Sequence, residues 1–186
     1  PPQHAISWPV FADVRSAWRG RIELEGVALV AIDELPEGPA LDDYVRLVAD
    51  HGGTLGAVTY PMPDLDARLV RLFELAARHG LDLDFHTDET TDAAADGLRR
   101  IAETCLSTGF QGRVTVGHAC SLSTQAQPDS LRTLDLVARA GLSVVTLPLC
   151  NLYLQDRAPG RTPRLRGVTL VHEMRARDIP VAIASD

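Results

Sequence analysis

The chain has 186 residues, of which 45% are hydrophobic and 23% are charged, which is the composition of a globular domain with one sizeable core. Its 18 Lys and Arg residues against 25 Asp and Glu residues give a formal net charge of −7, which disfavours nucleic-acid binding. No apolar run approaches the roughly 20 residues of a membrane-spanning helix, and three cysteines form no disulfide framework. We therefore expect a cytoplasmic protein without a nucleic-acid or membrane partner.

Short runs rich in Val, Ile and Leu alternate along the chain with longer amphipathic segments. The runs predict six strands, at 27–32, 54–60, 81–86, 114–118, 142–149 and 181–185. Each run is almost wholly apolar, as expected for parallel strands that are covered on both faces. The segments between them carry apolar residues at helical spacing, and Gly80 and Gly141 stand where two helices should end. The alternation predicts a parallel α/β fold.

The spacing of the strands separates the two common parallel folds. The predicted strand ends follow one another at about 31 residues on average, and eight such units make the roughly 250 residues of a (β/α)8 barrel. An open doubly wound sheet usually has a glycine-rich phosphate-binding turn after its first strand, and the sequence has none. We predict that residues 1–186 are part of a single catalytic (β/α)8 TIM-type barrel, whose two upstream strands and C-terminal end are missing.

Residues that bind metals or carry protons follow three of the predicted strands. His86 and His118 each end a strand, Asp186 follows the last one, and Glu89 lies three residues beyond His86. Because the carboxyl ends of barrel strands meet at one rim, we expect these side chains to converge in one bowl. Histidine and aspartate together bind divalent metals such as zinc or iron, and a nearby glutamate suits a proton carrier.

Each of these residues also has an ordinary structural interpretation. A lone histidine at a strand end is commonly a hydrogen-bonded core or rim residue, and an aspartate there is commonly the N-cap of the next helix. Asp88 and Glu89 could simply favour the start of a helix through its dipole. The sequence contains no H-E-x-x-H, G-x-S-x-G or P-loop motif, and we interpret Cys120, beside His118, as a packing residue.

Three segments match a known family in order and in spacing. They are FHTDE at 85–89, GHACSL at 117–122 and LPLCNLYLQDR at 147–157, and the match continues through 161–169 to ASD at 184–186. In these segments the chain resembles bacterial cytosine deaminases and their close relatives in the amidohydrolase superfamily. The resemblance extends over nearly the whole chain from Ser7 onward.

The resemblance implies a metal-dependent hydrolytic deaminase that acts on a small amino-substituted N-heterocycle and releases ammonia. It assigns His86 and Asp186 as ligands of one divalent metal ion, zinc or iron. It makes Glu89 the proton shuttle to the ring nitrogen, His118 a catalytic residue beside the nucleophilic water, and Asp186 the acceptor of the water proton. Asn151 and Gln155 in the third segment are the expected substrate-binding residues.

The sequence departs from the family pattern at two places. The His-x-His motif of the family's first strand is not found in the 186 residues, and Ala31, with Asp33 nearby, stands where cytosine deaminases carry the glutamine that binds the substrate amide. The heterocycle is therefore left open among pyrimidines, triazines and creatinine-like rings. Hydrolysis of another amide or C–N bond, and an inert barrel that only binds a ligand, are the two alternative functions. Assembly into a homo-oligomer is also left open.

The segment 151–167 is expected to be irregular and to cover part of the bowl. Pro159, Gly160 and Pro163 oppose regular structure, and the length of the segment suits a functional loop at the carboxyl end of a strand.

Overall fold

Six strands form one parallel sheet in the computed structural model, which describes residues 3–186. Their order in the sheet is the same as their order in the sequence, and each strand pairs in parallel with the next. A doubly wound sheet reverses its strand order at a switch point, whereas a barrel does not, so the structure confirms the predicted fold class. The strands are β1 Val27–Ala31, β2 Thr54–Val58, β3 Leu83–Thr87, β4 Val114–His118, β5 Ser143–Thr146 and β6 Val181–Ile183.

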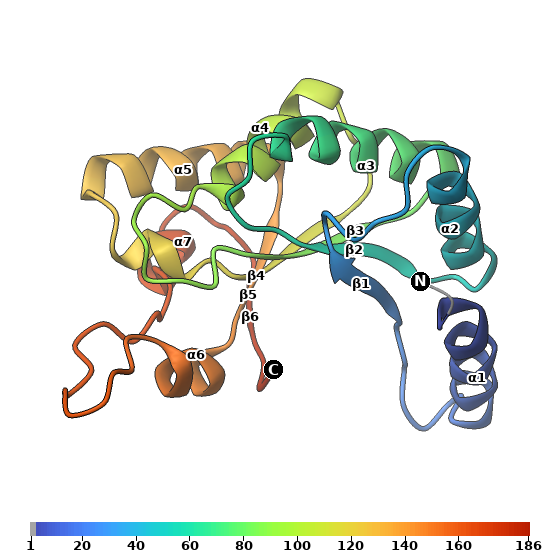
Figure 1. Ribbon diagram of the computed structural model, residues 1–186, viewed down its shortest axis with the longest axis horizontal. Coiled ribbons are helices and arrows are strands. Elements are labelled where there is room, and N and C mark those ends of the chain that lie inside the picture. The colour runs from blue at the N-terminus through green and yellow to red at the C-terminus, as the bar shows by residue number, and fades with distance from the viewer. Residues whose placement is uncertain (1–2) are drawn as a thin grey trace.

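Helices connect the strands and cover one face of the sheet. Figure 1 shows α3, α4 and α5 side by side along this face with α2 at one end, while α6 lies on the opposite side of the strands. Among residues 3–186, no helix combines the length and the apolar character required to cross a bilayer. The helices are α1 His4–Ala17, α2 Pro39–Asp50, α3 Leu65–His79, α4 Gly97–Thr108, α5 Gln127–Ala140, α6 Pro148–Leu154 and α7 Val171–Arg175, and a 3-10 turn spans Cys120–Ser123.

Two helices end at the glycines that the sequence predicted as helix ends. Gly80 ends α3 with φ 65° and Gly141 ends α5 with φ 67°, so both adopt the left-handed conformation that terminates a helix. The predicted strand at 142–149 is wrong in its second half, because Pro148 begins α6. Proline suits the first turn of a helix, since its fixed φ is already helical and its missing N–H would have no partner there.

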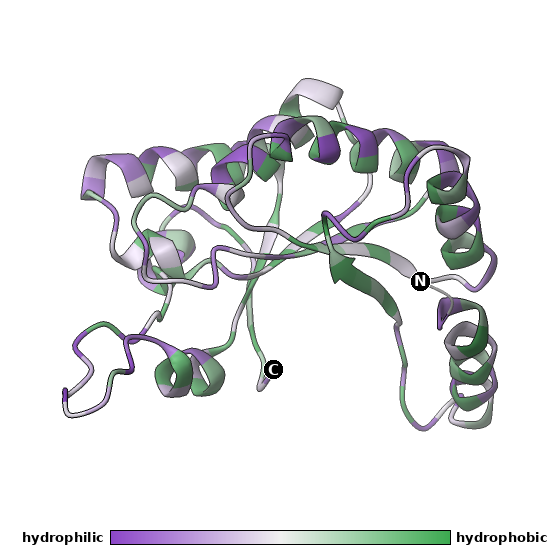
Figure 2. Cartoon of the chain, in the orientation of Figure 1, coloured by the Kyte–Doolittle hydropathy of each residue, from purple (hydrophilic) through white to green (hydrophobic). Residues whose placement is uncertain are grey.

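Alternate residues of β3 and β5 are buried, and in β3 they pack against the helices. Phe85 of β3 is fully buried and lies against Phe73 of α3, with the ring centroids 5.9 Å apart. Figure 2 shows hydrophobic strands beneath helices whose outer surfaces are hydrophilic. The remaining strand residues face the other way, and we call the face turned away from α2–α5 the inner face. In β3 these residues are Asp84 and His86, both half-buried.

Candidate functional site

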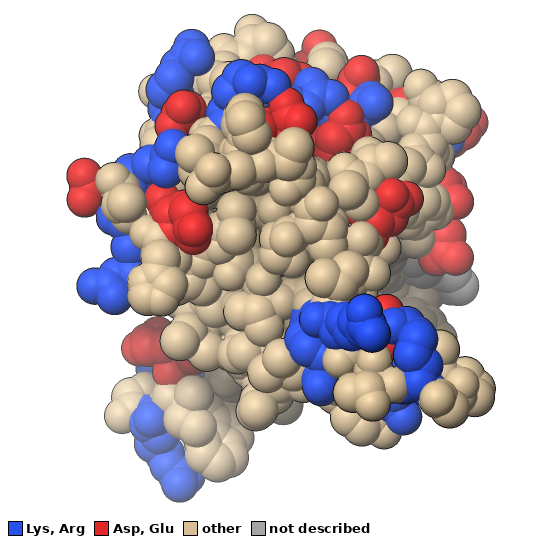
Figure 3. Space-filling model, turned by 90° about the vertical axis from the view of Figure 1, so that its left-hand side faces the viewer, with Lys and Arg blue, Asp and Glu red and all other residues tan. Residues whose placement is uncertain are grey.

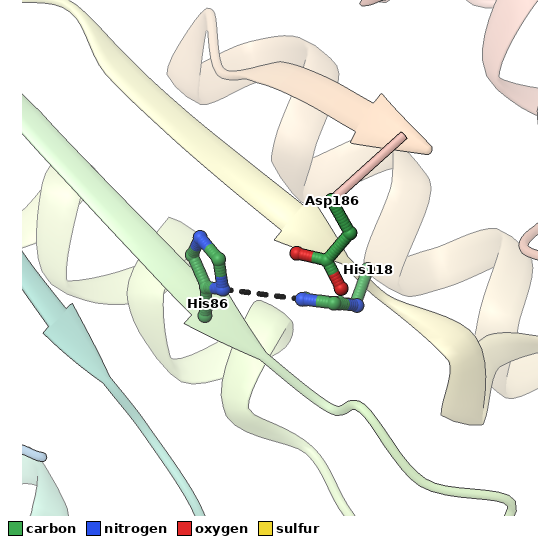
Figure 4. Close-up of side chains that lie close together, drawn as sticks. All are labelled: His86, His118 and Asp186. Atoms are coloured by element: carbon green, nitrogen blue, oxygen red, sulfur yellow. Dashed lines mark hydrogen bonds between the residues drawn. The ribbon is translucent and has the colours of Figure 1, made fainter. Parts of the chain in front are cut away.

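Two histidines at the ends of neighbouring strands meet on the inner face. The Nδ1 atom of His86 and the Nε2 atom of His118 are 3.1 Å apart, and the two rings meet edge to face at 64°. Asp186, after β6, completes the group: one ligand atom from each of the three residues lies within 4.8 Å of the others. Figure 4 shows the carboxylate beside the paired rings. The structure thus brings together the three residues that the sequence singled out.

The orientation of His118 depends on an unusual backbone conformation. Its register partner in β3 is Thr87, which is buried among the helices, so simple alternation would turn His118 away from the inner face. The backbone instead becomes left-handed, with φ 72° at His118 and 50° at Ala119. Left-handed backbone conformations are energetically unfavourable for residues other than glycine, and they are concentrated at functional sites. The turn places the His118 ring, of which 1% is exposed, against His86.

Two side chains contact the ring nitrogens of His118, and the surroundings act on its pKa. The Nδ2 amide nitrogen of Asn151 lies 3.2 Å from His118 Nδ1 and can donate to it. The hydrogen of the neutral ring then sits on Nε2, which faces His86. Burial lowers the pKa of His118, and the charge of nearby His86 acts in the same direction, against the opposing effects of Glu89 and Asp186. Burial thus favours the neutral form of the His118 ring.

Asn151 and Gln155, the expected substrate-binding residues, both lie beside the candidate site. Asn151 is 1% exposed and its amide is directed at His118. Gln155 lies just beyond α6, and its side-chain amide donates to the backbone oxygen of Glu89 at 3.2 Å. Their expected contacts with a substrate stay predictions, whereas both contact residues of the candidate site.

Glu89 lies at the open side of the histidine pair. Its Oε1 atom is 3.6 Å from Nδ1 of His118, and its side chain is 38% exposed. The alternative that Glu89 begins a helix does not hold, because the next helix, α4, starts only at Gly97. A carboxylate that touches a buried histidine and also reaches solvent can exchange protons between the site and water.

Asp88 supports the site from behind. Its carboxylate accepts hydrogen bonds from the backbone N–H groups of Gly97 at 2.8 Å and Leu98 at 3.0 Å, at the first turn of α4. Its backbone oxygen accepts from Cys120 N at 2.9 Å, directly after β4. The residue therefore ties together the ends of β3 and β4 and the start of α4. The helix-start interpretation is correct for Asp88, although the helix begins nine residues later.

Cys150 is a site neighbour that sequence reasoning missed. Its Sγ atom is 3.9 Å from Glu89 Oε1, and one ligand atom each from Cys150, Glu89 and Asp186 lie within 4.8 Å of one another. A hydrogen bond to Asp186, followed by desolvation and the charges of both carboxylates, raises the pKa of the thiol to about 11. The thiol is therefore protonated at neutral pH. Its position inside the matched segment 147–157 was the available signal.

The loop after α6 is irregular for most of its predicted length. Residues 151–154 belong to α6, so the prediction is wrong there, but no helix crosses 156–164. Asp156 organises the loop by accepting hydrogen bonds from the N–H groups of Arg164 at 2.6 Å and Leu165 at 2.9 Å and by pairing with Arg161. These donors hold the pKa of the Asp156 carboxyl well below its usual range. Figure 3 shows basic residues gathered on the lower part of the face where this loop lies.

The site lies at the carboxyl rim of a parallel barrel-type sheet, which is where the active sites of this fold are found. The two imidazoles and one carboxylate fit zinc or iron by the chemistry of their donor atoms. The model of the amidohydrolase family matches residues 11–186, and the chain belongs to that family.

Three known proteins show how close the relation is. A protein named pterin deaminase, from Rhizobium rhizogenes strain K84, is 51% identical over 185 residues, which cover 100% of this chain and 42% of that protein. A 5-methylcytosine deaminase from Klebsiella pneumoniae, solved with phosphonocytosine, is 25% identical with a TM-score of 0.83 and covers 96% of this chain and 44% of its own. An N-isopropylammelide isopropylaminohydrolase from Burkholderia multivorans is 26% identical with a TM-score of 0.65, over 94% of this chain and 42% of its own. The chain spans less than half the length of these relatives.

Proposed function

We propose that the protein is a hydrolytic deaminase that replaces an amino group on a nitrogen heterocycle by oxygen and releases ammonia. The observation that carries the proposal is the convergence of His86, His118 and Asp186, with the carboxylate of Glu89 3.6 Å from His118. Among the heterocycles we favour a pterin over cytosine. The relative named pterin deaminase is 51% identical to this chain, and the 5-methylcytosine deaminase is 25% identical.

The metal ligands in this proposal are His86 and Asp186. A divalent cation held there supplies acidity, because it lowers the pKa of a bound water toward neutrality. The two residues come from β3 and from the end of β6, so the folded sheet, and no local motif, creates the pair. Asp186 also offers a carboxylate oxygen that takes the proton as the water attacks the amino-bearing carbon.

Glu89 and His118 act on the substrate. Glu89 delivers a proton to the ring nitrogen next to the attacked carbon, which allows that carbon to become tetrahedral without charge building up on the ring. In this scheme a neutral His118 carries its hydrogen on Nε2 and, with substrate bound, donates it to the developing oxygen in place of Nδ1 of His86. A second proton, taken from the water by Asp186, moves to the amino group, which departs as ammonia, and the hydrogen left on the attacking oxygen returns to Glu89 as the carbonyl forms. Water supplies the oxygen and the protons, and no oxidant is needed.

Asn151 is a positioning residue in this scheme. In this scheme its side-chain amide donates a hydrogen bond to Nδ1 of His118, so the hydrogen of the neutral ring is on Nε2. Gln155 holds the backbone of Glu89 and so restricts where the glutamate side chain can reach.

Ammonia release from a panel of aminopyrimidines, aminotriazines and pterins, using the full-length zinc- or iron-loaded protein, tests the proposal. We expect turnover of at least one pterin, and loss of about 100-fold or more in kcat for Glu89→Gln. Glu23→Gln, which removes an exposed carboxylate outside the site, is the matched control and should leave kcat unchanged. Release of an alkylamine from substituted triazines without any ammonia release would instead support hydrolysis of another C–N bond. No turnover of any compound by the metal-loaded protein would contradict both.

A further inference from the structure

The loop after α6 carries a concentration of positive charge that the mechanism does not use. We call residues 157–166 the arginine loop, because four of these ten residues are arginines and none is acidic. All four are exposed, although the chain as a whole has a formal net charge of −7. Figure 3 shows basic side chains gathered around uncharged residues on this part of the surface. The arginines are Arg157, Arg161, Arg164 and Arg166.

Most of this charge is not neutralised by a neighbouring carboxylate. Arg161 pairs with Asp156, whereas the other three arginines form no ion pair within residues 3–186. The guanidinium carbon of Arg157 lies 4.3 Å from the centroid of the Tyr153 ring. Stacking on an aromatic ring fixes a guanidinium group but leaves its N–H donors free to bind a ligand. Arg157 is therefore a fixed cation that can still donate hydrogen bonds.

Both ends of the arginine loop lie beside the candidate site. Gln155, just before the loop, donates its side-chain amide to the backbone oxygen of Glu89 at 3.2 Å. Gly167, just after the loop, packs so closely that a Cβ atom there would lie 2.5 Å from Cγ of Gln155. Arg157 is only two residues beyond Gln155, and two extended residues span at most about 7 Å. The loop therefore begins and ends at the rim, next to the proposed proton carrier.

The arginine loop has a fixed shape and surrounds an open hollow. Asp156, at the base of the loop, accepts hydrogen bonds from two of its backbone N–H groups, at 2.6 Å and 2.9 Å. These bonds and two prolines restrict the backbone, so the arginines need little ordering when a ligand binds. The hollow has a volume of about 350 Å³ and is lined by Arg157, Arg161, Ala158, Pro159 and Pro163.

We propose that the arginine loop binds an anionic substituent, a carboxylate or a phosphate, on the edge of the heterocyclic substrate that faces away from the departing amino group. The inference rests on the proposed function and names the class of substituent that the ring carries. The planar fork of a guanidinium group matches two oxygens of a carboxylate or phosphate with two parallel hydrogen bonds. A nucleic acid would need a wider basic surface, and the rest of this chain is acidic.

The test compares two pterins that differ only in the charge of one substituent. One carries a propionate chain at C6, on the edge away from the amino group at C2, and the other carries the primary amide of the same chain. Dissociation constants are measured from the pterin fluorescence in stopped-flow mixing, before turnover, with the full-length metal-loaded protein. We expect the wild-type protein to bind the propionate at least about tenfold more tightly than the amide at low ionic strength. The preference should shrink as the salt concentration rises, because salt screens exposed charges.

Variants show whether the arginine loop causes this preference. Arg157→Gln should lower the preference about tenfold, because it keeps a polar side chain but removes the positive charge. Arg157→Glu should make the amide the tighter ligand. Arg139→Gln, which removes an exposed arginine of α5, is the matched control and should leave the preference unchanged. No preference in the wild-type protein, or an unchanged preference in Arg157→Gln, overturns the inference.

Inorganic phosphate distinguishes a substituent of the substrate from a free anion that acts as an effector. We expect phosphate to weaken binding of the propionate and to leave binding of the amide unchanged, because only the propionate uses the loop. Phosphate binding that depends on Arg157, detected by titration calorimetry, but that changes neither dissociation constant would show a separate anion site. That result overturns the assignment to the substrate.

Ammonia release measured on the same samples separates this inference from the proposed function. An anion preference that depends on Arg157, without ammonia release from any compound, supports the role of the loop and contradicts the deaminase. Ammonia release with a preference that Arg157→Gln leaves unchanged supports the deaminase and contradicts the role of the loop.

Discussion

The Nε2 atom of His118 lies 3.1 Å from the Nδ1 atom of His86, at the ends of two adjacent parallel strands. The contact exists because the backbone turns left-handed at His118 and brings that ring onto the inner face. The two histidines lie side by side but have different neighbours, so they can have different roles. Asp186 accompanies both, while Asn151 and Glu89 contact His118.

The first prediction separates these roles. His86→Ala should lower the metal content of the full-length protein, because it removes a ligand, whereas His118→Asn should keep most of the metal and lose about 100-fold or more in kcat. His172→Ala, at an exposed histidine of α7, is the matched control for both measurements. Metal content is measured by atomic emission on dialysed protein. Equal metal loss in both histidine variants would contradict the assignment.

The second prediction concerns stability. Asp88→Ala should lower the free energy of unfolding by about 1–3 kcal/mol, because it leaves the buried N–H groups of Gly97 and Leu98 without partners. Asp88→Asn should cost less, since its amide oxygen still accepts one hydrogen bond. Asp13→Ala, at an exposed position of α1, should change stability by less than about 0.5 kcal/mol. Urea denaturation at pH 7 gives the comparison, and a loss for Asp88→Ala no larger than for Asp13→Ala would refute this role.

The third prediction concerns the loop after α6 and its response to pH. The pKa of Asp156 is depressed in the folded protein, so the order that its carboxylate gives the loop is fully present above the ordinary carboxyl pKa of about 3.9. It is lost only as pH falls through the lower folded value. Protection of the Arg164 and Leu165 amides against hydrogen exchange, corrected for the intrinsic rate, should therefore be constant between pH 5 and pH 8.

Variants of Asp156 check the cause of that protection. Asp156→Ala should abolish the protection of both amides at every pH, because it removes their acceptor. Asp50→Ala, an exposed aspartate at the end of α2, should have no effect. Protection that declines between pH 8 and pH 5 in the wild-type protein would show that another group controls the loop.

The sequence predicted those features that depend on local pattern. Apolar runs marked the strands, and Gly80 and Gly141 marked the ends of α3 and α5, because left-handed backbone at a helix end favours glycine. The helix α1 was not predicted. Pro9 lies within it, and a proline disfavours the interior of a helix.

The candidate site could be predicted in its members but not in its contacts. Strand ends in a parallel barrel share a rim, so His86, His118 and Asp186 could be placed together from their positions alone. The left-handed turn at His118 and the approach of Cys150 to Glu89 arise from tertiary packing between segments far apart in the sequence. No local pattern encodes them.

Glu89→Gln in the full-length metal-loaded protein tests the central claim most directly. Glutamine keeps the shape and hydrogen-bonding capacity of the side chain but cannot exchange a proton at neutral pH. Glu89 lies outside any helix, so the substitution should leave unfolding free energy and metal content close to those of the wild-type protein. We predict bound metal at wild-type level with kcat for ammonia release reduced about 100-fold or more. A variant that retains more than about a tenth of the wild-type kcat would contradict the assignment of Glu89 as the proton carrier.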